Sequence, residues 1–359
     1  MGAKRPEAVA WLLVLLLVGC AAPAERPAPA AAGGASAPAA ASPATSTAAT
    51  ATPAPRVLRV STSGITGNSL IPWAPFEAGL FAKYGLQIDE LPDIASSTTA
   101  VQSLLSRDLD IISIAPNAAI EATAKGAPPL VTIATPPPGT GFWLYAAPGI
   151  SSVEDLRGKL IGANQPGSST YFAVTYALRE HGLQVGRDYQ VLSVGNQQAQ
   201  LASLQQGQTQ AAVFSVPGTV LARRAGMVEL KDLNDIPYNG YGVVVRREML
   251  DDPAGREVLL RYLQACVEGI ARLRQDRAFA DAVIRKYLKT DDPEVVDEVY
   301  RAFLPKRVPY VVPEGIALVL QGIAERDPSV PADLSPEQFY DNSLVAELER
   351  SGFIDALYR

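Results

Sequence analysis

The sequence predicts an α/β fold in which two units of alternating strands and helices are followed by a helical tail. Short apolar runs alternate with amphipathic helical patterns from Arg56 to Arg246. Glycine and proline turn signals separate these runs. Beyond Asp252 every pattern is helical, so the tail needs a sheet to pack on, and the first unit is the one that lacks cover.

The first unit begins with Arg56 to Ser63, where apolar and polar residues alternate as in a strand. A Gly-rich loop and a helix over 72–84 follow, in which Gly79 is expected to permit close helix packing and Gly85 to supply a left-handed exit. The further strands of this part are expected at 86–90, 110–115, 130–135 and 142–147, and the helices at 96–107 and 118–125.

The second unit opens at Lys159 with a strand, a polar loop and a helix. Its other strands are expected at 189–194, 210–214, 228–230 and 241–246, its helices at 197–206 and 218–225, and the tail helices at 256–274, 278–288, 293–303 and 336–350. Alternation of this length implies parallel open sheets, in which ligands bind beyond the carboxyl ends of the strands.

The loop that opens the second unit has a ligand-holding pattern. Ser168 or Ser169 can cap the helix that runs to Leu183. The first helical turn then presents free N–H groups beside the hydroxyls of Ser168, Ser169 and Thr170, an arrangement that suits a negatively charged or strongly polar group. The alternative is that these hydroxyls only cap the helix.

The N-terminus carries an export pattern. Lys4 and Arg5 precede an apolar run at 8–18, too short to span a membrane comfortably. The next residues, Leu17-Val18-Gly19-Cys20, resemble a bacterial lipobox, which implies a signal peptide at 1–19 and lipidation of Cys20. The alternative is an ordinary secretory signal with an incidental cysteine. Residues 20–55 are almost all Ala, Pro, Thr, Ser and Gly, which predicts a disordered tether.

Composition and net charge limit the classes of molecule that the chain is expected to bind. The chain is 48% hydrophobic and 19% charged, with a net charge of −6 and no cluster of Lys and Arg, so nucleic acid is not an expected partner. Cys266 lies on the apolar side of a helical pattern and is expected to be a buried thiol. His181 ends the helix of the second unit, where it is expected to complement the helix dipole at the surface.

The segments FEAGLFAKYGLQIDE, LLSRDLDIISIAPNAAIEATAKGAPPLVTIA, SVEDLRGKLIGANQPGSSTYFAVTYALREHGL and ASLQQGQTQAAVFSVPGTVLARRAG resemble extracytoplasmic solute-binding proteins of ABC importers. The subgroup is the one for nitrate, alkanesulfonates, taurine and thiamine-precursor pyrimidines. The resemblance implies a periplasmic-binding-protein-like fold of type II, with two α/β lobes joined by two hinge crossings and the tail packed on lobe one. Lobe one would be 56–146 with 241–359, lobe two 147–240, and the crossings would lie near 146–149 and 239–243.

The same resemblance implies a monomer outside the cytoplasm, anchored through Cys20, that passes a small molecule to a permease and its ATPase. The strand-to-helix loops contain no charged side chain but several aromatic ones, which favours a small organic ligand such as a sulfonate or pyrimidine over a bare anion. The expected ligand-binding residues are Ser63, Thr66, Asn68, Ser113, Asn117, Phe142, Trp143, Gly167, Ser168, Ser169, Thr170, Tyr171, Phe214, Tyr238 and Tyr241, with about half of the aromatics lining the pocket.

Two competing functions use the same scaffold. A desulfinase-like enzyme would need an activated nucleophile or an acid–base group in the cleft, and Cys266 and His181 both fall outside the cleft loops. The sequence therefore predicts no catalytic residue, no metal and no cofactor. A sensor that reports to a receptor instead of a permease fits the same residues, and an adjacent permease gene would separate the two.

Overall fold

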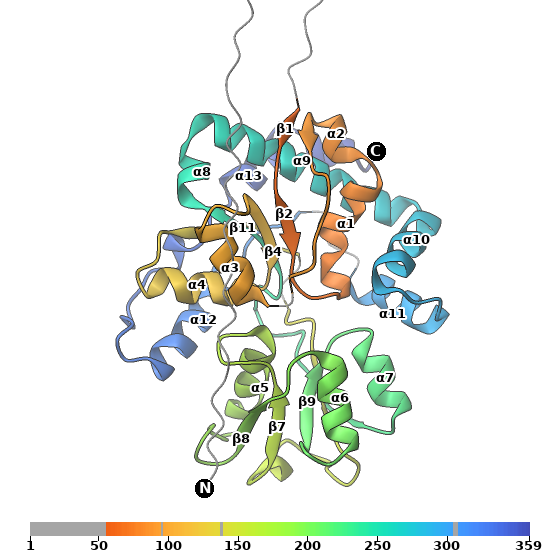
Figure 1. The fold of residues 1–359 in the computed structure, drawn as a ribbon, viewed down its shortest axis with the longest axis vertical. Helices are drawn as coiled ribbons and strands as arrows, with labels where there is room; N and C mark the ends of the chain where they lie inside the picture. The colour runs from red at the N-terminus through yellow and green to blue at the C-terminus, as the bar shows by residue number, and fades with distance from the viewer. Residues whose placement is uncertain (1–54, 95, 137–138, 304–307) are drawn as a thin grey trace, which may run out of the picture. The chain divides into compact units, whose positions relative to one another are not determined.

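The computed structural model describes residues 55–94, 96–136, 139–303 and 308–359, which form two sheets with helices packed against them (Figure 1). The predicted signal peptide and nearly all of the tether, with Cys20, lie outside the described residues. Within the described part of the chain, no helix combines the length and apolarity needed to cross a membrane.

The first sheet has four strands in the order β2 (Val60–Thr62), β4 (Ile111–Ile114), β11 (Gly242–Arg246) and β5 (Leu130–Ala134). β2 and β4 are parallel, but β11 runs antiparallel to both of its neighbours. The expectation of a wholly parallel sheet is therefore wrong here, because β11 enters from the second unit in the opposite direction. The expected strand at 56–63 is split into β2 and a short β1 (Arg56–Val57), which pairs with β3 (Leu86–Gln87).

The second sheet has five strands in the order β10 (Val228–Asp232), β6 (Trp143–Ala146), β9 (Ala211–Phe214), β7 (Leu160–Ala163) and β8 (Gln190–Ser193). β7 is parallel to β8 and β9, whereas β6 and β10 join antiparallel. This sheet is also mixed, not wholly parallel.

Helices cover both faces of each sheet. In the first sheet, alternate residues such as Ile111 and Val243 pack toward α9 (Pro253–Gln275), while Ile112 and Val244 pack toward α3 (Ser97–Leu105) and α4 (Asn117–Ala124). In the second sheet, one face packs on α5 (Ser169–Arg179), and the other on α6 (Gln197–Gln205) and α7 (Gly218–Arg224). Strand faces buried on both sides explain the continuous apolar runs in the sequence.

A helix break replaces the single helix expected at 72–84. α1 (Leu70–Glu77) and α2 (Leu80–Lys83) are separated at Gly79, whose φ of +67° is left-handed. No atom lies within 4 Å of the position that a Gly79 Cβ would take, so the expected role in close packing is wrong and the conformation is what requires glycine. Gly85, with φ +69°, adopts the left-handed conformation that was predicted.

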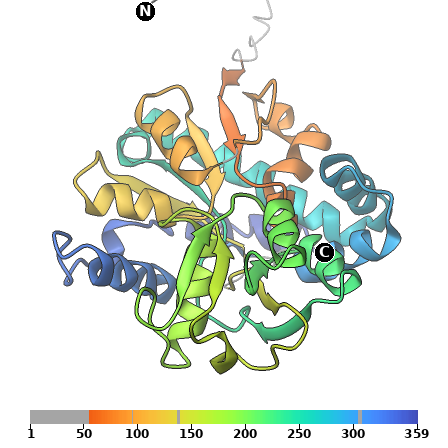
Figure 2. The ribbon, with the colours of Figure 1, turned by 60° about the horizontal axis from the view of Figure 1, so that its bottom comes forward.

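The tail consists of α8 (Arg247–Asp251), α9, α10 (Arg277–Leu288), α11 (Pro293–Phe303), α12 (Pro313–Arg326), α13 (Ser343–Arg350) and α14 (Phe353–Ala356). α9 supplies the expected cover for the first sheet. Both views show α10 and α11 beside α1, and α12 beside α4 on the opposite flank (Figures 1 and 2). α12 was not predicted, and the helix predicted at 336–350 begins only at Ser343, after a short 3₁₀ turn, Pro336–Gln338.

The chain passes between the sheets twice, between Ala134 and Trp143 and again between Asp232 and Gly242. The two passages lie side by side, since Gly139 N–H donates to the Tyr238 carbonyl at 2.8 Å. The predicted second crossing, 239–243, overlaps the observed passage. The predicted first crossing, 146–149, falls after β6, which already belongs to the five-stranded sheet. The exact limits of the lobes stay a prediction, and β6 favours an earlier first limit.

Candidate functional site

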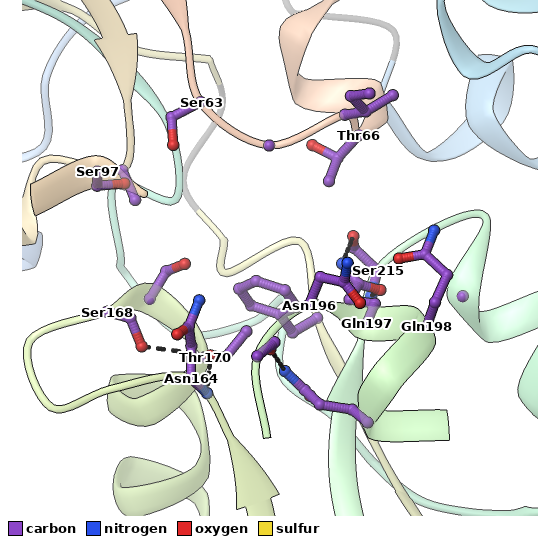
Figure 3. A pocket seen from close by; sticks show the side chains of 18 of the residues that line it. Ser63, Thr66, Ser97, Asn164, Ser168, Thr170, Asn196, Gln197, Gln198 and Ser215 are labelled. Atoms are coloured by element: carbon purple, nitrogen blue, oxygen red, sulfur yellow. Dashed lines mark hydrogen bonds between the residues drawn. The ribbon is translucent and has the colours of Figure 1, made fainter. Parts of the chain in front are cut away.

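A cavity of about 540 Å³ is lined by segments from both sheets and from the two passages between them. Figure 3 shows Ser63, Thr66 and Ser97 on one side of the gap, and Asn164, Ser168, Thr170, Asn196 and Gln198 on the other. The passages contribute Phe142, Gly240 and Tyr241. This volume lies in the range typical of small-molecule sites.

The cavity wall consists largely of helix starts. The N-terminal ends of α3, α5 and α6 contribute Ser96 to Thr98, Ser168 to Thr170 and Asn196 to Gln198. Pro217 and Gly218 at the start of α7 also line it. The first turn of each helix has backbone N–H groups without intrahelical partners, so the wall is rich in donors and carries positive partial charge.

At the start of α5, two of the three predicted hydroxyls have local partners. Ser168 Oγ accepts a hydrogen bond from Tyr171 N at 3.2 Å, which confirms Ser168 as the helix cap. Thr170 Oγ1 accepts from Asn164 N at 3.0 Å and so ties the loop after β7 to the helix. Ser169, at the first helical position, is half-buried and also lines the cavity.

Sequence reasoning missed the amide side chains of the α6 start. Asn196 Oδ1 caps α6 by accepting from Ala199 N at 2.9 Å. Gln197 clamps the end of β9, because its Oε1 accepts from Ser215 N at 2.9 Å and its Nε2 donates to Ser215 Oγ at 2.8 Å. Asn196 follows β8 as Ser168 follows β7, so the strand–polar–helix order was a signal that could have found it.

Gln200, also in the cavity wall, is 1% exposed. Its Nε2 donates to Gly195 O at 2.9 Å, whereas its buried Oε1 has no hydrogen-bond partner among the described residues. A buried acceptor without a donor costs free energy, so a donor that reached this oxygen would recover that cost.

Asp93 is the charged side chain of the cavity lining in the part of the chain that the structure describes. It follows β3, and its backbone forms an isolated parallel bridge with Thr62 at the end of β2. Partial burial raises the pKa of the Asp93 carboxyl, and the Gly64 N–H and the Thr62 hydroxyl beside it reduce that rise. The expectation of loops without charge missed Asp93 because the loops it considered did not include the segment after β3, which pairs beside the end of β2.

Eight of the fifteen predicted residues line the cavity: Ser63, Thr66, Asn68, Phe142, Ser168, Ser169, Thr170 and Tyr241. Two of the six predicted aromatics are among them. Tyr241 is buried, and its hydroxyl lies 3.3 Å from Ser69 Oγ.

The other seven lie elsewhere. Asn117, Gly167 and Tyr171 line a much smaller neighbouring cavity, together with Glu121. The fully buried Tyr238 stacks on Phe172 with ring centroids 4.5 Å apart. Phe214 packs edge-on against Tyr145 within the second sheet, Trp143 packs at the edges of two apolar clusters, and Ser113 is buried in β4. A Cβ on Gly167 would meet Glu121 at 2.9 Å, so this glycine faces that carboxylate.

The polar groups of the site do not form a metal centre. Among the described residues, no group of three or more His, Cys, Asp or Glu side chains is placed to hold a metal ion. Cys266 is buried in α9, where burial raises the pKa of its thiol, and it does not line the cavity.

A cavity between two α/β lobes joined by paired crossings defines a solute-binding fold, and comparison with known proteins agrees. The family model for the phosphonate periplasmic substrate-binding protein of ABC transporters matches residues 72–280. The chain therefore belongs to this family of periplasmic substrate-binding proteins. No curated protein sequence matches it.

Solved structures share the fold at low sequence identity. The alkanesulfonate-binding protein SsuA from Xanthomonas axonopodis pv. citri, bound to MOPS, has 18% identity and a TM-score of 0.67, over 80% of this chain and 99% of that one. The aliphatic sulphonate-binding protein SsuA from Escherichia coli has 23% identity and a TM-score of 0.64, over 79% and 91%. The nitrate-binding protein NrtA from Synechocystis PCC 6803 has 14% identity and a TM-score of 0.62, over 83% and 89%.

Proposed function

We propose that the chain is the solute-binding component of an ABC importer, which captures a small polar organic molecule in the cavity and delivers it to a membrane permease and its ATPase. The observation that carries this proposal is the cavity itself, because both sheets contribute strand ends and helix starts to its wall. A site divided in this way can close on a ligand when the two halves approach.

The ligand class follows from the wall. Helix starts and amide side chains offer many donors, and Phe142 and Tyr241 offer apolar surface. Sulfonates, pyrimidines and related aromatic or polar compounds fit these groups, and the similar structures are proteins named for alkanesulfonate and nitrate. A bare inorganic anion is less suited, since the described lining contains no Lys, Arg or His side chain.

The hinge is proposed at the two passages between the sheets, near Gly139 and Asn239. Two chain crossings side by side permit rotation of one lobe against the other, and a ligand that contacts both lobes favours the closed form by its difference in affinity.

The location proposed is outside the cytoplasm, as a monomer anchored through a lipid on Cys20. The support is the lipobox-like sequence before Cys20 and the membership of a periplasmic family.

The cavity is proposed to perform no chemistry. The buried Cys266 thiol has a raised pKa and lies outside the cavity. His181 Nδ1 lies 2.6 Å from Glu154 Oε1 at the far end of α5. Neither group is therefore placed as a nucleophile or base toward a bound molecule.

One experiment tests binding and delivery together. The purified full chain is screened by thermal shift against sulfonates, pyrimidines, amines, sugars and aromatic acids, where a compound at 100 times its Kd adds about 2.7 kcal/mol. Uptake of each binder is then measured in the source cells with the gene deleted and restored, as wild type or as Cys20→Ser. We expect uptake to depend on the gene, and the Cys20→Ser protein to leave the membrane fraction.

If none of the screened compounds bound to the chain, the proposal would be contradicted. Binding without gene-dependent uptake would favour the sensor function. Equal membrane retention of the Cys20→Ser protein, with normal processing, would contradict the anchor alone.

A further inference from the structure

The cavity has an uneven distribution of charge. Its described lining contains no Lys, Arg or His side chain, so a ligand anion can form no ion pair there. Two cations near the α5 loop have another partner: Lys125 and Arg326 both bind the Glu121 carboxylate, at 2.8 and 3.0 Å. The helix starts compensate part of a negative charge through their N–H groups.

Asp93 is the charged side chain that the described cavity lining does contain, and its charge is negative. Among the described residues the Asp93 carboxylate forms no ion pair, and the polar groups that stabilise its charged form are the Gly64 N–H and the Thr62 hydroxyl. A carboxylate has about four acceptor sites, so capacity remains for a ligand donor. A closed cavity removes water from this group, and an unpaired carboxylate in that setting is costly unless a cation compensates it.

Gln200 is a second, independent acceptor in the wall. Its Oε1 is buried and unpartnered within the described residues. Gln200 comes from the second lobe and Asp93 from the first, so each lobe contributes a residue with an acceptor group to the cavity wall. An anion alone would leave Asp93 facing a like charge and would leave Gln200 Oε1 without a donor.

We propose that the ligand carries a protonated amine, and that Asp93 is the specificity-determining residue that pairs with it. This inference rests on the proposed function and narrows its ligand class to organic cations and zwitterions. An anionic or hydrogen-bond-accepting group of the same molecule contacts the helix starts of α5 and α6. Gln200 Oε1 accepts a hydrogen bond from an N–H or O–H of the ligand.

Matched probes on one skeleton test the charge requirement. Calorimetry on the full chain compares 2-phenylethylamine with its neutral N-acetyl amide and with 2-phenylethanesulfonate, and compares taurine with N-acetyltaurine and ethanesulfonate. We expect the amine of at least one series to bind at least tenfold more tightly than both of its partners, since a charge-assisted hydrogen bond is lost in each partner. An amine that binds no better than its amide or sulfonate in both series, or that does not bind, overturns the inference.

The residue is tested by Asp93→Asn, which keeps an acceptor for Gly64 and Thr62 but removes the charge. We expect amine affinity to fall roughly 10- to 100-fold while affinity for the amide stays within twofold. Asp89→Asn is the matched control, because Asp89 is an exposed carboxylate near Asp93 in the chain that accepts from Gln87 Nε2 at 2.9 Å and does not line the cavity.

An equal loss for amine and amide, with a lower melting temperature of the empty protein, would assign Asp93 a purely structural role and overturn the proposal. A protein that binds only anionic or neutral compounds from the broad screen would overturn it too, yet would leave the importer function standing. A protein that binds nothing in that screen contradicts the importer function first.

Discussion

The two lobes meet in two chemically different ways, at the cavity and at the flank beside it. In the cavity they present hydroxyls, amides and helix starts, with Asp93 as the charged group of the described lining. At the flank, which we call the α7–α11 contact, they meet through ion pairs. Its members are Arg223 and Arg224 from α7, and Asp292, Glu294 and Glu298 at or near the start of α11.

This difference means that ligand recognition and the approach of the two lobes depend on different residues. Ion pairs at the α7–α11 contact connect the lobes where solvent screens the charges, so they favour approach without deciding what the cavity holds. Thr219 adds a hydrogen bond from its hydroxyl to Glu298 at 2.7 Å in the same place. The cavity keeps its donors and acceptors for the ligand. Changes in the two regions should therefore have different signatures.

The largest effect is expected from Gly240→Ala in the cavity wall. A Cβ at this position would lie 2.5 Å from the Gly139 carbonyl oxygen and 2.9 Å from that of Thr140. These are backbone atoms of the adjacent passage, so the two crossings must separate. We expect a loss of about 1–3 kcal/mol of unfolding free energy, measured by denaturant titration.

Gly322→Ala is the matched control for this change. Gly322 lies within α12 with no atom within 4 Å of the added Cβ and without a left-handed φ. Alanine there should leave stability unchanged or raise it by about 0.5–1 kcal/mol. If Gly240→Ala were as stable as wild type, the close approach of the two passages would be wrong.

A smaller effect is expected at the start of α5, where the neighbouring Ser168 and Ser169 are expected to have different roles. Ser168→Ala removes the cap that accepts from Tyr171 N and should cost about 1 kcal/mol of stability in the empty protein. Ser169→Ala should leave the melting temperature of the empty protein unchanged and weaken ligand binding about threefold to tenfold, because a ligand hydrogen bond is worth roughly 0.5–1.5 kcal/mol. Calorimetry well below the melt measures the second effect. Equal dissociation constants for Ser169→Ala and wild type would mean that the helix start only caps itself.

The smallest effect is expected from the α7–α11 contact. Arg223→Ala with Arg224→Ala should raise the apparent Kd only about twofold to fivefold, since exposed pairs contribute about 0.2–1 kcal/mol each. Added salt should weaken wild-type binding toward that of the variant and leave the variant unaffected. Arg277→Ala is the control, because Arg277 binds Asp281 and Asp297 within the tail and does not connect the lobes.

The pH dependence of this contact has a definite sign. The Arg224 guanidinium holds the pKa of Asp292 below its usual range. Burial alone would raise the pKa of Glu298, but hydrogen bonds from Arg223 and Thr219 outweigh it, and the net pKa is lowered. Lowered carboxylate pKa values mean that the stabilisation is present at neutral pH and is lost only as the pH falls through those lowered values. A contact that weakened between pH 6 and 8 would contradict these assignments.

Much of the local structure could be predicted because its causes are local. The strand period of two and the helical period of 3.6 located nearly every element, and the cap at Ser168 and the left-handed turn at Gly85 were predicted from residue type and position. Within the helix at 72–84, however, Gly79 was assigned to packing although its conformation was the cause. Glycine alone does not distinguish these two roles.

The loops of the candidate site were predicted in part for a similar reason. Ser63, Thr66 and Ser169 follow strands whose carboxyl ends meet at the cavity, so sheet geometry brought them together. Tyr238 and Phe214 have equally suggestive positions, yet burial of their rings against Phe172 and Tyr145 stabilised the core instead. An aromatic side chain next to a loop can line the cavity or pack in the core, and the local sequence does not determine which of the two occurs.

By itself the sequence determined the two α/β units, their order, the helical tail and the hydroxyl-rich start of α5, because these depend on neighbours a few residues away. Only the tertiary structure decided that β11 inserts antiparallel between β4 and β5, that β6 joins the second sheet, and that Asp93 lines the cavity. Those outcomes depend on pairings between residues as far as 132 positions apart, such as Val244 with Ile112. Strand partners are chosen by the total burial and hydrogen bonding of the sheet, and an apolar run has the same pattern whichever partner it finds.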